Sequence, residues 1–78
     1  MKDDDFLKII GKNIADIREA AGITMNRASQ LALVKWAQYR DIEAGKVGAN
    51  IKTYKKIADA LDVELHKFFI LETPKRKR

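Results

Sequence analysis

Apolar residues recur at helical spacing along most of the chain. Near the start they follow one another at steps of three or four residues, at Phe6, Ile10, Ile14, Ile17 and Ala21. Charged residues occupy positions between them, which is typical of an amphipathic helix whose apolar stripe faces a core. Gly22 indicates the end of this helix, because glycine readily adopts the left-handed conformation that commonly follows a helix C-terminus.

Two shorter helical segments follow with almost no connection between them. Thr24 has a side-chain oxygen that can cap a helix N-terminus, and apolar spacing then runs from Ala28 to Ala32. The spacing slips at residues 33–34 and resumes with Tyr39 and Ile42. The pattern therefore predicts a second and a third helix that abut.

The rest of the pattern predicts two more helices. Asn50 is a good N-cap for a fourth helix, whose apolar positions are Ile51, Tyr54, Ile57, Ala58 and Leu61. Asp62, which tolerates left-handed geometry, separates it from a short fifth helix over residues 64–71. The residues expected to face inward there are Leu65, Phe68 and Phe69. Five helices without a strand pattern predict a compact all-α bundle.

The 78 residues suffice for one small domain. Residues 1–5 and 73–78 hold too few apolar residues to offset the entropy of ordering them. We therefore expect a flexible N-terminus over residues 1–5, a folded domain over residues 6–72 and a flexible basic tail over residues 73–78.

Charge is distributed unevenly along the chain, whose formal net charge is +5. Residues 24–56 hold seven basic and two acidic residues, or +5, whereas residues 57–74 hold one basic and four acidic residues, or −3. The positive segment covers the second and third helices and the connection that follows. This polarity favours a polyanionic partner.

The inventory of reactive side chains argues against an enzyme. The chain has no cysteine and one histidine, which excludes disulfides, thiolate metal sites and a thiol nucleophile. No metal-binding or phosphate-loop motif occurs, so we expect no catalysis, cofactor or metal. Apolar runs are far shorter than the ~20 residues that span a bilayer. We expect no membrane association and a cytoplasmic, nucleoid-associated location.

The segments fall in a familiar order, namely Ile17-Arg18, Ala21-Gly22-Ile23-Thr24, Leu31-Ala32, Ile42-Glu43-Ala44-Gly45-Lys46 and Ile57 to Val63. In this order and spacing the chain resembles the phage-repressor-like helix-turn-helix family, also called the xenobiotic-response-element family of bacterial regulators. The resemblance implies a lambda-repressor-like five-helix bundle in which the third helix lies in the DNA major groove and dimers read two half-sites.

Three positions depart from the family pattern. Met25 stands where the family usually has a phosphate-binding glutamine, and Ala28 replaces a larger core aliphatic residue. Leu33 replaces the glycine commonly found in the turn of the motif. Because a left-handed leucine costs about 1 kcal/mol, we expect this turn to be built differently.

A wheel of the third helix with Tyr39 and Ile42 pointing inward defines a candidate base-reading surface on its other side. This surface comprises Trp36, Ala37, Gln38, Arg40 and Asp41. An arginine suits the acceptor edge of guanine, a glutamine suits adenine and an alanine suits the thymine methyl.

Three of these residues have alternative interpretations. Arg40 either reads a base or is a solvated or phosphate-contacting charge. Asp41 either accepts a hydrogen bond from cytosine or is turned away from DNA, since Ala37 and Gly45 at helical spacing offer no donor. Trp36 either packs at the core edge or donates its indole N–H to a phosphate.

Residues in and around the second and third helices, which form the helix-turn-helix, are candidates for phosphate contacts. Backbone N–H groups at the N-terminus of the fourth helix would aid these contacts. The candidate residues are Arg27, Lys35, Lys46, Asn50 and Lys52. Arg18 and Glu43 match positions where the family commonly has a salt bridge. We favour that structural role over DNA contact.

The end of the predicted fold holds a dense apolar cluster, made of Leu65, Phe68, Phe69, Ile70 and Leu71. Exposed clusters of this kind commonly mark interfaces, so we predict a homodimer through it. The alternative is a terminal helix that packs both faces against the first and fourth helices.

Together these features predict a sequence-specific double-stranded DNA-binding transcriptional regulator, a repressor or controller that binds palindromic half-sites as a homodimer. The alternatives are an antitoxin, which would also bind a protein partner, and a protein-interaction module that uses the same fold. The basic tail is a phosphate clamp, a nuclear-localisation-like basic string or a solubilising end.

Overall fold

The computed structural model describes residues 2–71, which form four α-helices followed by a short 3-10 helix. The elements are α1 (Asp3–Ala20), α2 (Met25–Ala32), α3 (Trp36–Glu43), α4 (Ile51–Ala60) and η1 (Leu65–Phe69). None of the described residues forms a strand. The all-α prediction is confirmed, and no helix of the described part is long and apolar enough to cross a membrane.

The short fifth helix predicted over residues 64–71 is present as a 3-10 helix and not as an α-helix. Only five residues wind there, and they form a 3-10 helix, in which the Lys67 N–H donates to the Glu64 carbonyl at 3.1 Å. A 3-10 turn closes over fewer residues than an α-turn and is used in short pieces. The bundle therefore has four α-helices and one short 3-10 segment.

The predicted helix ends agree closely with the structure. The Thr24 hydroxyl accepts from the Arg27 N–H at 3.1 Å, and Asn50 Oδ1 accepts from the Thr53 N–H at 2.9 Å. Gly22 and Asp62 both take left-handed conformations, with φ of +73° and +59°. Local capping chemistry thus fixes where α2 and α4 begin and where α1 and α4 end.

The first helix begins earlier than its apolar stripe predicts. Residues 1–5 were expected to lie outside the fold, yet α1 starts at Asp3, and the Phe6 N–H donates to the Lys2 carbonyl at 3.0 Å. Acidic side chains in a first turn interact favourably with the positive end of the helix dipole. The predicted tail over residues 73–78 lies outside the described residues.

The turn between α2 and α3 has the left-handed geometry that Leu33 was expected to disfavour. Leu33 has φ +59° and ψ +40°, and the N–H groups of Leu33 and Val34 donate to the carbonyls of Gln30 and Ser29. The prediction of a differently built turn is therefore wrong. Those bonds and the packing of the flanking helices outweigh a strain of about 1 kcal/mol.

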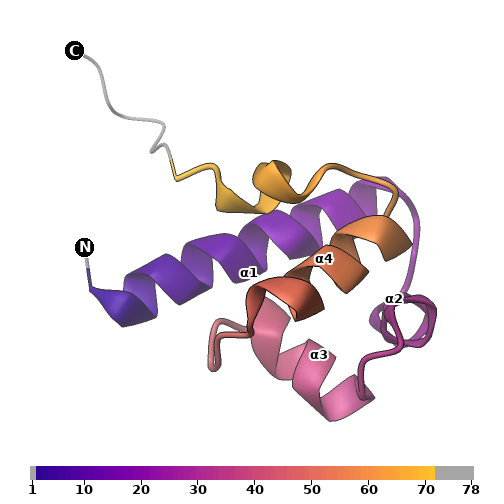
Figure 1. Ribbon diagram of the computed structural model, residues 1–78, viewed down its shortest axis with the longest axis horizontal. Helices are drawn as coiled ribbons and strands as arrows, with labels where there is room; N and C mark the ends of the chain where they lie inside the picture. The colour runs from indigo at the N-terminus through magenta and orange to yellow at the C-terminus, as the bar shows by residue number, and fades with distance from the viewer. Residues whose placement is uncertain (1, 72–78) are drawn as a thin grey trace.

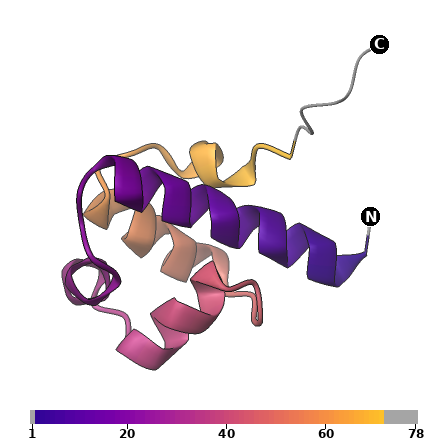
Figure 2. The same cartoon turned by 180° about the vertical axis from the view of Figure 1, so that it is seen from behind.

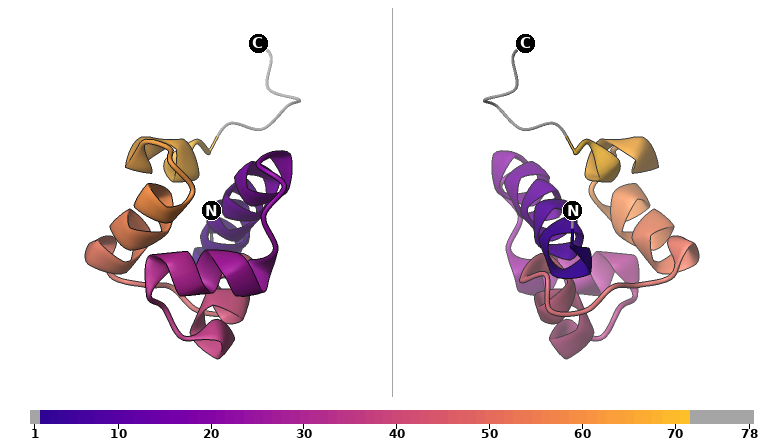
Figure 3. Two further views of the ribbon diagram at one scale, coloured as in Figure 1. Left: turned by 90° about the vertical axis from the view of Figure 1, so that its right-hand side faces the viewer. Right: turned by 90° about the vertical axis from the view of Figure 1, so that its left-hand side faces the viewer.

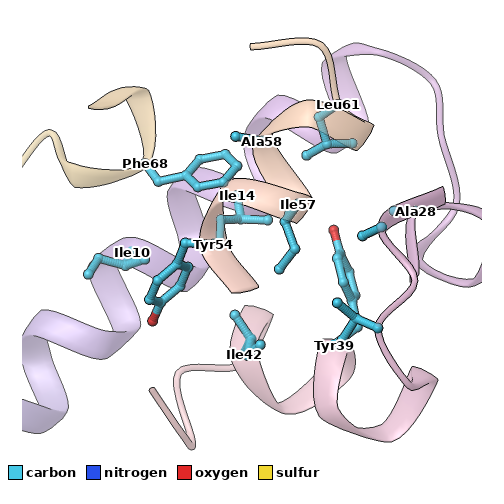
Figure 4. Packing of buried hydrophobic residues seen from close by; sticks show 12 residues of the cluster. Ile10, Ile14, Ala28, Tyr39, Ile42, Tyr54, Ile57, Ala58, Leu61 and Phe68 are labelled. Carbon is cyan, nitrogen blue, oxygen red and sulfur yellow. The ribbon is translucent and has the colours of Figure 1, made fainter. Parts of the chain in front are cut away.

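The helices enclose a core to which every element contributes. Figures 1 and 2 show α1 running along the domain with η1 beside it, and α4 also contacts η1. In Figure 3, α3 lies at the narrow end of the molecule below α2. Figure 4 shows the buried cluster, which includes Ile10, Ile14, Tyr39, Ile42, Ile57 and Phe68.

The C-terminal segment is fastened to α1 by Asn13, a contact that the sequence pattern did not indicate. Asn13 Nδ2 donates to the Phe68 and Ile70 carbonyls, at 3.0 Å each. Phe69 adds an edge-to-face contact with Tyr54, whose ring centre lies 5.4 Å away. Phe68 is completely buried, so its assignment to a dimer interface is wrong. It fills the monomer core because η1 packs across α1 and α4.

Candidate nucleic-acid interface

The inner face of α3 is anchored in the core. Tyr39 and Ile42 are buried, as the helical wheel predicted. Figure 4 shows the Tyr39 side chain pointing from α3 into the interior, with its hydroxyl at the inner end. The opposite face of the helix is consequently directed outward at the narrow end of the molecule, as Figure 3 shows.

A buried ion pair joins α3 to α1. Arg18 Nε and Nη2 donate to Glu43 Oε2 and Oε1 at 2.7 and 3.1 Å, and the two side chains are 11% and 6% exposed. Arg18 Nη1 also donates to the Ile23 carbonyl at 2.8 Å. The hydrogen bond to Glu43 raises the pKa of Arg18, against the effect of burial. The salt bridge that the resemblance implies is present, and it fixes the C-terminal end of α3.

Gly11 lets α1 approach the end of α3 closely. A Cβ at this position would lie 2.4 Å from the Glu43 carbonyl oxygen and 2.6 Å from that of Ile42. Both neighbours are backbone atoms and cannot turn aside like a flexible side chain. Gly11 therefore sets the separation of the two helices beside the Arg18–Glu43 pair.

The Tyr39 side chain places a hydroxyl group in this buried region, where it forms no hydrogen bond within the described residues. Burial raises the pKa of the Tyr39 hydroxyl above its ordinary value, and the nearby Glu43 carboxylate acts in the same direction. The phenol stays neutral, and its unpaired state opposes folding.

The outward face of α3 carries the predicted base-reading residues. Ala37 and Gln38 are exposed, and Trp36 is 43% exposed. Arg40 Nε donates to Asp41 Oδ1 at 3.1 Å, and the Arg40 guanidinium carbon lies 5.0 Å from the centre of the Trp36 ring. The prediction that Asp41 lacks a donor is therefore wrong, because the adjacent arginine supplies one.

The candidate phosphate-binding residues lie next to this face along the chain. Lys35 immediately precedes α3, Lys46 lies in the connection after it, and Arg27 and Lys52 lie in the first turns of α2 and α4. All four are exposed, and none forms an ion pair within residues 2–71. By contrast, Lys55 pairs with Asp59 at 2.7 Å. These four charges are thus available to an anionic ligand.

No group of histidine and acidic residues in the described part of the chain is arranged to hold a metal ion. His66 is exposed and lies 3.5 Å from Glu64 on the surface of η1. The exposed basic residues around α3 can bind an anionic ligand, and they define the candidate site.

Comparison with known proteins relates both the sequence and the fold to helix-turn-helix regulators. Residues 14–68 match the model of the HTH_3 helix-turn-helix family. The restriction-modification controller protein C.AhdI from Aeromonas hydrophila superposes with a TM-score of 0.78 and 25% identity, over 83% of this chain and 97% of that one.

A second structure, an HTH_3 family transcriptional regulator from Vibrio cholerae, has a TM-score of 0.81 and 29% identity over 87% of this chain. The match covers 38% of the Vibrio cholerae chain, so the likeness concerns one part of a longer protein. A search of curated proteins gave no match.

Proposed function

The chain belongs to the HTH_3 helix-turn-helix family, and from this premise we propose that it is a sequence-specific repressor or controller of transcription that inserts α3 into the DNA major groove. Proteins of this family are DNA-binding regulators of transcription and not enzymes, which agrees with the prediction from the side-chain inventory. The observation that carries the proposal is the outward face of α3, where Gln38 and Arg40 are exposed on a helix whose other face is anchored.

Two kinds of contact divide the work of binding. Phosphate contacts supply affinity and fix the register of the protein on DNA, whereas contacts to base edges supply sequence choice. The exposed cations at the starts of α2, α3 and α4 suit the first role. Asn50 belongs to the same group by position, although its side-chain oxygen already caps α4. Residues of the outer face of α3 suit the second role.

We also propose a homodimer that reads palindromic half-sites. Ile70 is 44% exposed, and Leu65, Phe69 and Leu71 are each partly exposed although they pack at the edge of the domain. A two-fold partner would cover this surface and would present two copies of α3 to DNA. Ile70→Asp should shift the sedimentation of the protein toward the monomer while its circular dichroism spectrum keeps the helical content of the wild type. A monomeric wild type at micromolar concentration would contradict the dimer.

The central test is to select bound sequences from a random DNA pool and then titrate the enriched duplex by fluorescence anisotropy. A dimeric reader should enrich a palindrome. If each subunit neutralises about 3–4 phosphates, log K should fall with log salt at a slope of about −5 to −7. No enrichment together with a slope near zero would overturn the proposal.

Two lysines provide a matched comparison within that experiment. Lys35→Ala removes an unpaired charge beside α3 and should weaken binding to all sequences, reducing the salt slope by about 1 for each subunit. Lys55→Ala removes a lysine already paired with Asp59 and should have a smaller effect. Equal losses for the two variants would contradict the assignment of Lys35 to phosphate binding.

A second candidate is an antitoxin or protein-interaction module with the same fold. It is favoured by two exposed leucines, Leu31 and Leu33, which are 43% and 83% exposed and border a shallow hollow between α2 and α4. Arg40→Ala together with Lys35→Ala distinguishes the candidates. Only a DNA reader should lose binding to its own promoter region while keeping its thermal melt. A cotranslated neighbouring gene of similar size would favour the antitoxin.

A further inference from the structure

Arg40 is held at two places on the outer face of α3. Its Nε donates to Asp41 Oδ1 at 3.1 Å, and its central guanidinium carbon lies over the Trp36 ring, 5.0 Å from the ring centre. The side chains of Arg40 and Asp41 are 45% and 28% exposed, so the pair reaches solvent. The guanidinium is therefore oriented in the free protein.

These contacts leave one edge of the guanidinium free. Its central carbon lies over the Trp36 ring, and Asp41 accepts from its Nε. Within residues 2–71 the Arg40 side chain makes no other hydrogen bond. Nη1 and Nη2 consequently present a fork of N–H donors, the arrangement that matches O6 and N7 of guanine in the major groove.

The pair also changes how the charge of Arg40 acts. A free arginine at a DNA surface attracts phosphates of any sequence, whereas the adjacent carboxylate offsets this charge. A flexible side chain also loses conformational entropy when a base orders it, and an already oriented one loses less. Both effects turn Arg40 from a general contributor to affinity into a reader of one base.

We propose that Asp41 is a positioning residue that, together with Trp36, holds Arg40 as an end-on reader of a guanine and does not itself read cytosine. This inference rests on the proposed function, because it concerns the same surface of α3. It assigns sequence choice to a carboxylate whose own charge is repelled by DNA.

The test compares the wild-type chain with Asp41→Asn on two duplexes at one salt concentration. One duplex is the selected operator, and the other has a single G·C pair changed to A·T. This base pair is identified with the Arg40→Ala variant. It is the pair whose change weakens binding by the wild type but leaves binding by Arg40→Ala unaffected. The wild type should prefer the original duplex by about 5- to 150-fold.

For Asp41→Asn we expect this preference to fall several-fold, while affinity for random-sequence DNA stays equal or rises because a negative charge has been removed. A purely electrostatic role would raise both affinities together and leave the preference unchanged, which would overturn the proposal. Loss of preference at a different, C·G pair would also overturn it, because Asp41 would then read a base directly.

Asp16→Asn is the matched control, since it removes a carboxylate from an exposed pair with Lys12 on α1. It should change neither the preference nor the general affinity. If the wild type prefers no selected sequence, the proposed function itself fails. If it binds its operator and Asp41→Asn retains the full preference, only the role of Asp41 fails.

A measurement without DNA addresses the positioning itself. Nitrogen-15 relaxation of the Arg40 Nε–H group should show a more restricted side chain in the wild type than in Asp41→Asn. Equal mobility in the two free proteins would overturn the positioning role whatever the DNA results. Unchanged thermal melts of both variants would exclude a general loss of structure as the cause.

Discussion

Two arginine–carboxylate pairs involve α3, and they place the same chemical groups in different surroundings. Arg18 and Glu43 form two hydrogen bonds with side chains that are 11% and 6% exposed, whereas Arg40 and Asp41 form one bond with side chains that are 45% and 28% exposed. The first pair joins two helices, and the second joins neighbouring residues of one helix. The buried Arg18–Glu43 pair thus stabilises the fold, whereas the exposed Arg40–Asp41 pair is accessible to a ligand.

The two pairs differ in the free energy that is lost when one partner is removed. Removing one partner of a buried pair leaves an uncompensated charge away from water, which costs about 3–5 kcal/mol. Breaking an exposed pair exchanges it for hydration, so its contribution is about 0.2–1 kcal/mol. The inner pair should therefore govern stability, and the outer pair should govern binding.

The largest expected effect is that of Glu43→Gln. The amide keeps the shape of the side chain but removes the buried carboxylate, which leaves Arg18 only the exposed Glu19 carboxylate at 3.6 Å. We therefore expect a loss of about 3–5 kcal/mol in the free energy of unfolding. Urea titration monitored by circular dichroism measures this loss. The double variant Arg18→Met with Glu43→Leu should recover much of it, because well-packed apolar residues often replace such pairs at little loss. A single variant as stable as the wild type would contradict the comparison.

Gly11→Ala tests the same junction through its backbone. Alanine normally stabilises a helix relative to glycine by about 1 kcal/mol. Here the added Cβ would meet the Glu43 and Ile42 carbonyl oxygens, at 2.4 and 2.6 Å. Overpacking of this kind costs about 1–3 kcal/mol, so we expect a net loss of stability and of operator affinity together. Increased stability on denaturant titration would show that α1 and α3 can separate freely.

Arg40→Ala should affect binding much more than folding. Loss of a bidentate base contact corresponds to about 1–3 kcal/mol of sequence discrimination, whereas loss of an exposed pair lowers stability by at most about 1 kcal/mol. Anisotropy titrations of operator and mismatched duplexes measure the first quantity, and thermal melts measure the second. A large fall in melting temperature without a change in discrimination would reverse the roles of the two pairs.

The smallest expected effect is a gain of stability in Tyr39→Phe. The hydroxyl is buried without a partner in the described part of the chain, and an unsatisfied buried group costs about 1–3 kcal/mol. We expect a gain at the lower end, about 1 kcal/mol, which for a domain of this size raises the melting temperature by roughly 4–8 °C. Operator discrimination should stay the same, because the substitution lies on the inner face. A loss of stability would mean that the hydroxyl has a bound partner in solution.

Local features of the fold were accessible from the sequence. Thr24 and Asn50 cap helices through their own neighbouring backbone, and the inward positions of Tyr39 and Ile42 follow from helical periodicity. Such signals depend on residues within a few positions of one another. They sufficed for the four α-helices and for the two faces of α3.

Features that depend on distant residues or on long side chains were not accessible. The contacts of Asn13 join residues 55 and 57 positions apart, and no local pattern marks them. The prediction for Leu33 considered only the intrinsic cost of its left-handed conformation, which the surrounding hydrogen bonds and packing outweigh. The Arg40–Asp41 pair lies outside the usual helical rule that neighbours in sequence do not face each other. A long arginine side chain can bend back across that separation.

The position of Arg40 over the Trp36 ring also gives the protein an intrinsic fluorescent reporter. Trp36 is the only tryptophan in the chain, so every change in indole emission originates at the face of α3 proposed to contact DNA. When a base meets the free edge of Arg40 beside the ring, the surroundings of the indole change at that moment. Stopped-flow fluorescence of the unlabelled protein would thus measure how fast α3 forms its base contacts after the first encounter with DNA.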